Sequence, residues 1–175
     1  VMETLHLLKR DECALVIIDT QEKLHKVIPD SHQVMNRVTV LAEAARLLGV
    51  PVIVTEQYPK GVGPTVEEIR RAAGDAPIIE KREFGCFANA DFEQSMAPYH
   101  NKTLVLCGFE THVCVCQTAL QARALGHRVV VVADAVSSRA PSDRQIGLER
   151  MRLAGCVLVS VEMLCFEWLT TSADP

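Results

Sequence analysis

The chain has 175 residues, 49% of them hydrophobic, and a formal net charge of −4, which is ordinary for a globular protein. No basic run marks a nucleic-acid surface, and no apolar run approaches the roughly 20 residues of a membrane-spanning helix. We therefore expect a single domain over residues 1–175 that binds neither nucleic acid nor a membrane.

The seven cysteines are dispersed through apolar segments, and no two of them form a Cys-x-x-Cys pair. An odd number without that spacing predicts neither a disulfide framework nor a zinc site. Free thiols in this number, together with the absence of a basic-then-apolar pattern in residues 1–10, predict a cytoplasmic protein.

Strand and helix patterns alternate through the first half of the chain. Residues 14–18 are a continuous apolar run rich in β-branched side chains, which predicts a strand buried on both faces, with Asp19 just past its carboxyl end. A long amphipathic helix follows, with Asp30 as its N-cap, Gln33 as the capping-box partner and Gly49 as its end. The other elements predicted in this half are a strand at 52–55, a helix at 65–73, a short strand from 78 that ends at Lys81, and a helix at 88–96.

The second half opens with a predicted strand at 104–107, a glycine turn and a helix that carries Cys114 in its first turn. The dipole and unsatisfied N–H groups of a helix start favour a thiolate there. At 3.6 residues per turn Cys114 and Cys116 lie about 200° apart, so Cys116 belongs to the core stripe and Cys114 points elsewhere. The remaining predicted elements are a strand at 129–132, a helix capped by Ser142, a strand at 157–159 and a last helix from 161.

This β-α alternation predicts a three-layer α/β/α sandwich around a six-stranded, mostly parallel sheet. Sites in such sheets form at the carboxyl ends of the strands, and Asp19, Lys81 and Cys114 each lie at such an end. The three groups suit nucleophilic catalysis, with Cys114 attacking, Asp19 accepting the thiol proton and Lys81 stabilising negative charge. Backbone N–H groups of the turn before Cys114 are placed to hold an oxyanion.

Four sequence blocks carry a resemblance to a known family. They are Asp19-Thr20-Gln21; Lys81 with Gly85-Cys86-Phe87; Gly108, Thr111, Cys114, Val115 and Thr118; and Asp134 to Arg139. In this order and spacing, over about residues 12–160, the chain resembles the isochorismatase-like hydrolases, a superfamily that includes the nicotinamidases, and within it the isochorismatase-domain-containing subgroup. The resemblance implies a catalytic triad at Asp19, Lys81 and Cys114, and oxyanion donors in the backbone N–H groups of Glu110 and Cys114. It also implies a cis peptide between Phe109 and Glu110, and a homo-oligomer that is a dimer or larger.

One departure from the nicotinamidases concerns their metal. Nicotinamidases bind a metal through an Asp-x-His pair, and the aligned positions here are Glu56 and Tyr58, before Pro59. Because tyrosine replaces an imidazole ligand poorly, we expect no metal and no other cofactor. The protein is therefore not expected to be a nicotinamidase.

The resulting prediction is a cysteine-dependent hydrolase that cleaves a small carbonyl compound, an amide in the first instance, through a thioester on Cys114. Two alternatives stay open: a catalytically silent protein-interaction module, and a redox sensor that pairs Cys114 with Cys116 or Cys107. The loops at the strand ends supply the expected lining of the substrate pocket, namely Gln21, Gln57, Tyr58, Phe84, Phe87, Thr111 and His112.

Overall fold

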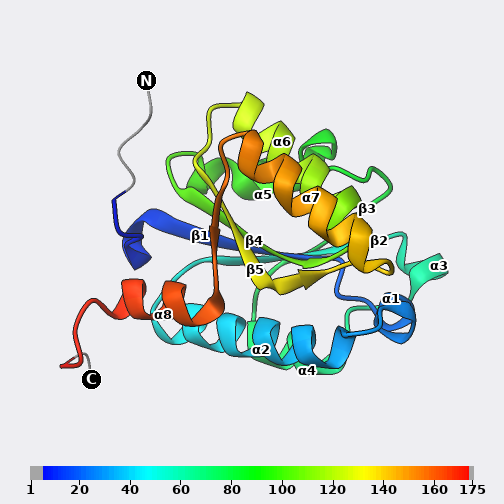
Figure 1. The fold of residues 1–175 in the computed structure, drawn as a ribbon, viewed down its shortest axis with the longest axis horizontal. Helices are drawn as coiled ribbons and strands as arrows, with labels where there is room; N and C mark the ends of the chain where they lie inside the picture. The colour runs from blue at the N-terminus through cyan, green and yellow to red at the C-terminus, as the bar shows by residue number, and fades with distance from the viewer. Residues whose placement is uncertain (1–5, 174–175) are drawn as a thin grey trace.

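The computed structural model describes residues 6–173, and its centre is one sheet of six parallel strands (Figure 1). The strand order is β3-β2-β1-β4-β5-β6, and every neighbouring pair is parallel. The predicted α/β architecture is confirmed, with a sheet that is parallel throughout. The strands are β1 (Cys13–Ile18), β2 (Val52–Gln57), β3 (Ile78–Lys81), β4 (Thr103–Phe109), β5 (Val129–Ser137) and β6 (Val157–Val159).

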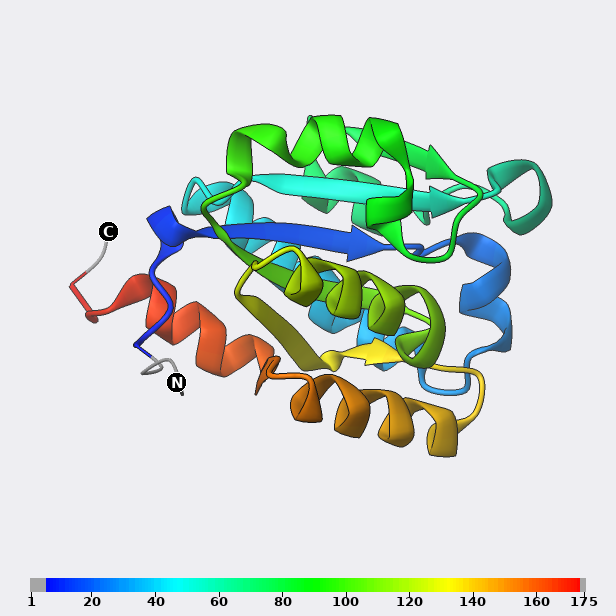
Figure 2. The same ribbon diagram turned by 90° about the horizontal axis from the view of Figure 1, so that it is seen from above.

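Helices cover both faces of the sheet, and the two views show the three layers (Figures 1 and 2). One face carries α2 (Ser31–Leu47), α4 (Glu67–Ala73) and α8 (Val161–Leu169); the other carries α5 (Ala90–Met96), α6 (Cys116–Ala124) and α7 (Pro141–Leu153). Each layer has its own apolar cluster against the sheet. Within residues 6–173 no helix combines the length and the apolar character needed to cross a membrane.

Short elements occupy the loops. Two helices lie beyond the carboxyl ends of strands, α1 (Glu22–Val27) after β1 and α3 (Pro59–Val62) after β2. The turn after β4 is a π-helical segment, Thr111–Val115, that leads directly into α6. Three 3-10 turns complete the set, at Arg10–Glu12, Cys86–Ala88 and Ala97–Tyr99.

Several helix boundaries differ from the sequence prediction for reasons of tertiary structure. Helix α2 begins after Asp30 as predicted, but the Asp30 side chain does not cap it and instead accepts a hydrogen bond from Ser137 Oγ. Helix α7 begins after Ala140 and not after Ser142. Strand β5 continues as far as Ser137, well past the apolar run that marked it in the sequence. Helix α1 was not predicted, because its six residues carry no apolar stripe.

The strand order reverses between β1 and β4, the place where parallel sheets form their binding crevices. These two strands approach each other very closely at this point. Gly108 pairs with Ile18 at a φ of +125°, and a Cβ on Gly108 would lie 2.0 Å from the Ile18 carbonyl oxygen. The close approach brings the end of β1, which carries Asp19, beside the turn that carries Cys114.

Candidate active site

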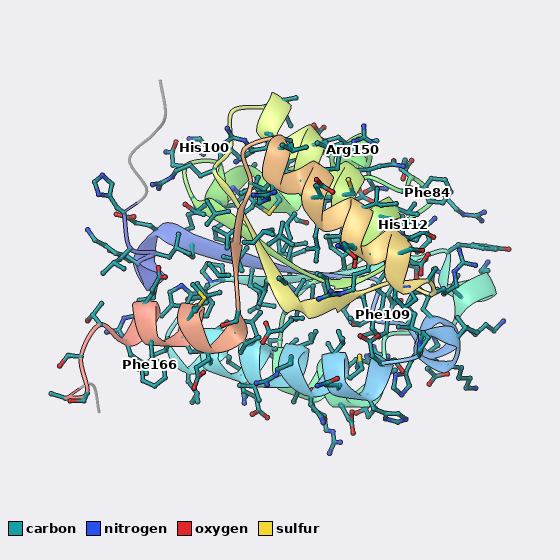
Figure 3. The ribbon with its side chains drawn as sticks, in the orientation of Figure 1. Phe84, His100, Phe109, His112, Arg150 and Phe166 are labelled. Carbon is teal, nitrogen blue, oxygen red and sulfur yellow. The ribbon has the colours of Figure 1, made fainter. Side chains whose placement is uncertain are left out.

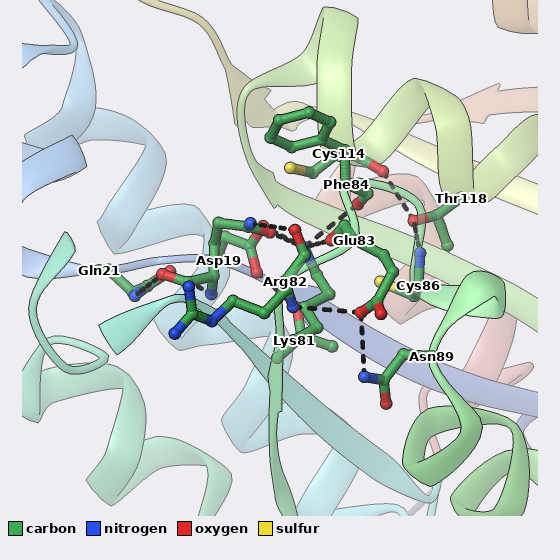
Figure 4. Close-up of polar contacts among 12 residues, drawn as sticks. Asp19, Gln21, Lys81, Arg82, Glu83, Phe84, Cys86, Asn89, Cys114 and Thr118 are labelled. Atoms are coloured by element: carbon green, nitrogen blue, oxygen red, sulfur yellow. Dashed lines mark hydrogen bonds and ion pairs between the residues drawn. The ribbon is translucent and has the colours of Figure 1, made fainter. Parts of the chain in front are cut away.

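A buried ion pair joins Lys81 and Asp19, with Lys81 Nζ 2.8 Å from Asp19 Oδ2 (Figure 4). Strand β2 lies between β1 and β3, so the Lys81 side chain reaches across the end of β2 to meet Asp19. Two β2 side chains complete the network: Thr55 donates to Asp19 Oδ1 at 2.7 Å, and Gln57 Oε1 accepts from Lys81 Nζ at 2.7 Å. Both charged side chains are at most 1% exposed.

The Lys81 ammonium has four oxygen acceptors. Besides Asp19 and Gln57, the carbonyl oxygens of Glu83 and Phe84 each accept from Nζ at 3.2 Å, because the chain after β3 curls around the ammonium. Burial by itself lowers the pKa of Lys81, but the Asp19 charge, aided by the nearby thiols, outweighs it and raises that pKa above the ordinary value. Lys81 is therefore a cation throughout the neutral pH range, held in place by its four acceptors.

Cys114 lies on a sharp turn between β4 and α6. Glu110 adopts a left-handed conformation (φ 60°), and the π-helical turn then places Cys114 with 5% of its surface exposed. No cis peptide occurs within residues 6–173, so the Phe109–Glu110 bond is trans, contrary to what the family resemblance implied. The left-handed Glu110 reverses the chain here instead, and its carboxylate accepts a hydrogen bond from the Arg139 backbone N–H at 3.1 Å.

The resting state of the Cys114 thiol differs from the sequence expectation. A helix start predicted a lowered pKa, but burial raises the pKa of Cys114, the Asp19 carboxylate raises it further, and Lys81 offsets only part of this. The thiol therefore keeps its proton at rest. Ionisation of Cys114 requires transfer of that proton to a base, and the Asp19 carboxylate is the acceptor whose charge acts on the thiol.

A second thiol, Cys86, shares this site and was missed in the sequence. Burial raises the pKa of Cys86 to about 11, although Lys81 acts in the opposite direction. The Thr118 hydroxyl ties the two cysteines together: it accepts from the Cys86 N–H at 3.0 Å and donates to the Cys114 carbonyl at 2.7 Å (Figure 4). The sequence did carry a signal for this arrangement, since Cys86 belongs to the second family block and Thr118 to the third.

Four of the expected pocket residues cluster around the ion pair, in different roles. Gln21 is fully buried, and its amide holds the loop after β2 by binding the Gln57 backbone and the Gly63 carbonyl. Gln57 contacts the Lys81 ammonium directly. Tyr58 and Phe84 are 39% and 55% exposed, at the rim.

The other three expected pocket residues are more dispersed. Phe87 packs edge-to-face on Phe92 and belongs to the apolar cluster under α5–α7. Thr111 is fully buried in the turn. His112 lies with Phe84 at the end of the molecule where the strands finish (Figure 3), and its Nδ1 is 3.0 Å from Ser138 Oγ.

Glu56 and Tyr58, the positions aligned with the nicotinamidase metal ligands, make other contacts in this structure. Glu56 is buried, and its Oε1 accepts from the Thr65 backbone N–H at 2.7 Å. Tyr58 lies under the Arg82 guanidinium. Among residues 6–173 no three His, Cys, Asp or Glu side chains are grouped to hold a metal ion.

The fold and this site define an α/β protein with an acid, an ammonium and a thiol at the reversal of strand order. The family model for the isochorismatase domain matches residues 13–163, and the chain belongs to that family. An isochorismatase domain-containing protein 2 from Xenopus laevis is 37% identical, over 92% of this chain and 78% of that protein.

Two solved structures show the same fold. A structure described as MAR1 ribonuclease from Caenorhabditis elegans has a TM-score of 0.90 and 34% identity, over 97% of this chain and 88% of that one. The YcaC gene product of Escherichia coli, described as an octameric hydrolase of unknown specificity, also has a TM-score of 0.90, with 28% identity over 97% and 85% of the two chains. The resemblance that the sequence indicated is thus confirmed at the level of the family.

Proposed function

We propose that the protein is a cysteine-dependent hydrolase of a small carbonyl compound, an amide in the first instance, with Cys114 as the nucleophile. The observation that carries this proposal is the placement of three groups at one edge of the sheet. Lys81 is ion-paired to Asp19 at 2.8 Å, and Cys114 follows β4, the strand that pairs with β1 directly before Asp19. The charges of Asp19 and Lys81 both shift the pKa of the Cys114 thiol. A thiol, its proton acceptor and a fixed cation are the parts that acyl transfer to cysteine needs.

In the first half of the proposed reaction the Cys114 sulfur attacks the substrate carbonyl carbon while its proton passes to the Asp19 carboxylate. The carbonyl oxygen becomes an oxyanion, for which we propose the backbone N–H groups of Glu110 and Cys114 as donors. When the tetrahedral adduct collapses, the C–N bond breaks, Asp19 returns the proton to the departing amine, and a thioester on Cys114 remains.

In the second half a water molecule attacks the thioester, and Asp19 takes one proton from it. The C–S bond breaks, the carboxylic acid leaves, and the proton returns to the sulfur, so the starting state is restored. Lys81 keeps its proton throughout in this scheme. Its role is to offset the negative charge that moves between Asp19, the sulfur and the oxyanion.

The direct test is a panel of small amides, ureas and esters, with ammonia or acid release as the readout. The proposal expects turnover of at least one compound by the parent protein, and loss of that turnover in Cys114→Ala. A turnover that survives in Cys114→Ala would remove Cys114 from the mechanism. A panel without turnover, combined with a specific protein partner, would favour a silent interaction module.

The proposal specifies a small molecule and not RNA, although three similar solved structures are described as ribonucleases or putative ribonucleases. Two observations support this choice: the formal net charge is −4, and Cys114 is buried, with 5% of its surface exposed. Incubation of the purified protein with a labelled RNA, alongside the amide panel, decides between the two substrate classes.

Two further expectations remain part of this proposal. All seven cysteines are free, which supports a reducing compartment such as the cytoplasm. Phe166 and Met163 on α8 are 67% and 53% exposed, which supports self-association through that helix; Phe166 stands away from the body of the molecule in Figure 3.

A further inference from the structure

A cavity of ≈ 260 Å³ opens beside the buried ion pair, at the carboxyl ends of β2 and β3. Lys81 lies in its wall, so the cavity and the proposed catalytic groups share one residue. The other side chains that matter for its chemistry are Tyr58, Lys60, Arg82, Glu83 and Asn89. No role follows for this cavity from the family membership or from the triad.

The most defined feature of the cavity is a stacked pair. The Arg82 guanidinium carbon lies 3.9 Å from the centroid of the Tyr58 ring. The ring in turn rests on Gly61, where a Cβ would lie 2.5 Å from a ring carbon, so only glycine leaves room for it. Tyr58 itself has a φ of 35°, a conformation that a bulky residue adopts only when its surroundings enforce it.

Polar side chains hold the loop that carries Tyr58. Lys23 Nζ donates to the Gly61 carbonyl at 2.6 Å, and Gln21 Nε2 donates to the Gly63 carbonyl at 2.7 Å. The Tyr58 backbone N–H donates to the Lys81 carbonyl at 3.0 Å. The ring on which Arg82 stacks is therefore fixed relative to the buried ammonium.

The Arg82 guanidinium is left free to bind a ligand. Within residues 6–173 the guanidinium makes no hydrogen bond and no ion pair, and it stacks on the Tyr58 ring. The neighbouring carboxylate of Glu83 is engaged elsewhere, since its Oε2 accepts from the Arg82 backbone N–H and from Asn89 Nδ2, each at 3.1 Å. Glu80 and Lys60 also line the cavity, and their formal charges are opposite.

We propose that Arg82, held by Tyr58, binds an anionic oxygen group of the substrate, so that the substrate class is a small amide that also carries a carboxylate or a comparable anion. A planar guanidinium suits this task because it donates two parallel hydrogen bonds to such a group. The proposal rests on the proposed hydrolase function. Arg82 determines which substrate is bound and has no part in the bond-breaking steps.

Two thiol reagents of similar size test the proposal, iodoacetate with a carboxylate and iodoacetamide without a charge. The quantity measured is the ratio of their alkylation rates at Cys114, followed by intact mass and peptide mapping at low salt. We expect the Arg82→Gln variant to lower the iodoacetate-to-iodoacetamide ratio by about threefold or more, and high salt to reduce the difference. Arg71→Gln, on exposed α4 surface, is the control for net charge and should leave the ratio unchanged.

Tyr58→Leu tests whether the stack that positions Arg82 matters in addition to its charge. The variant removes the aromatic ring and keeps the guanidinium. The ratio should fall in this variant too, by less than in Arg82→Gln. An unchanged ratio in Arg82→Gln, or an equal fall in Arg71→Gln, overturns the subsite while leaving the nucleophile in place. Equally slow alkylation of Cys114 and Cys165 by both reagents would count against the hydrolase proposal instead.

A second measurement needs no reactive thiol. In Cys114→Ala, binding of benzoate and of benzamide is followed by saturation-transfer NMR; the two ligands share a shape and differ in charge. We expect benzoate to bind more tightly, and the preference to be lost in Cys114→Ala/Arg82→Gln. A benzoate preference that survives without Arg82 places the anion site elsewhere and refutes the assignment.

Discussion

Replacing Asp19 by asparagine tests the energetics of the buried ion pair with almost no change of shape. The asparagine amide can still accept from Lys81 and bond to the Thr55 hydroxyl, so the variant removes the charge and keeps the hydrogen-bonding geometry. Lys81 then remains buried without its counter-ion. Breaking such a pair from one side costs about 3–5 kcal/mol, and we expect about 3 kcal/mol because Gln57 Oε1 and two carbonyl oxygens stay in place.

Urea denaturation measures this loss, with Asp11→Asn on the exposed surface as the control, expected within about 0.5 kcal/mol of the parent. In Asp19→Asn/Lys81→Met both charges are gone, and most of the lost stability should return. A cost below about 1 kcal/mol for Asp19→Asn, or no recovery in the double variant, would refute the account of the pair.

The pH dependence of the Asp19→Asn variant gives a second readout. In the parent, Asp19 holds the pKa of Lys81 above the ordinary value, so the stability from this pair is present throughout the neutral range and is lost only in strong alkali. Without Asp19, burial lowers the pKa of Lys81, and the unfolded state then binds the extra proton. The stability of the variant should therefore rise between about pH 7 and 10, where that of the parent does not.

Three further predictions follow from the same geometry. Acrylamide addition to Cys114 should be nearly independent of pH around neutrality, because Asp19 takes the proton internally; in Asp19→Asn the rate should rise about tenfold per pH unit, as for a simple thiol. Thr118→Val should cost about 1–3 kcal/mol in urea denaturation and slow that addition, because a buried N–H loses its acceptor. Gly108→Ala should destabilise far more than Gly126→Ala, since both have positive φ but only Gly108 also faces a backbone clash; equal costs in urea denaturation would contradict this.

Much of this molecule could be predicted from the sequence because the signals are local. Continuous apolar runs mark buried parallel strands, and the residue after each run lies at the carboxyl edge of the sheet. This rule alone predicts that Asp19, Lys81 and Cys114 share one edge. Gly49 and Gly126, both with positive φ, ended their helices as expected.

The features of the site that could not be predicted from the sequence depend on contacts between distant segments. Asp19 and Glu110 are left-handed non-glycine residues just past the ends of the neighbouring strands β1 and β4, and no local sequence pattern marks them. The raised pKa of Cys114 follows from burial and from the Asp19 charge. Together these outweigh the lowering of the pKa that a position near a helix start predicts. The stack of Arg82 on Tyr58 joins two loops that are far apart in the chain, and neither loop has a periodic pattern.

The central claim is that Cys114 is the activated thiol of this site, and site-resolved alkylation tests it most directly. The parent, Cys114→Ala and Cys165→Ala are treated with iodoacetamide at neutral pH, and intact mass follows the first added group. Cys165 is the control because it is the most exposed of the seven cysteines, the other six being buried. The account predicts that fast labelling persists in Cys165→Ala and disappears in Cys114→Ala; labelling of Cys114→Ala at the parent rate would contradict it.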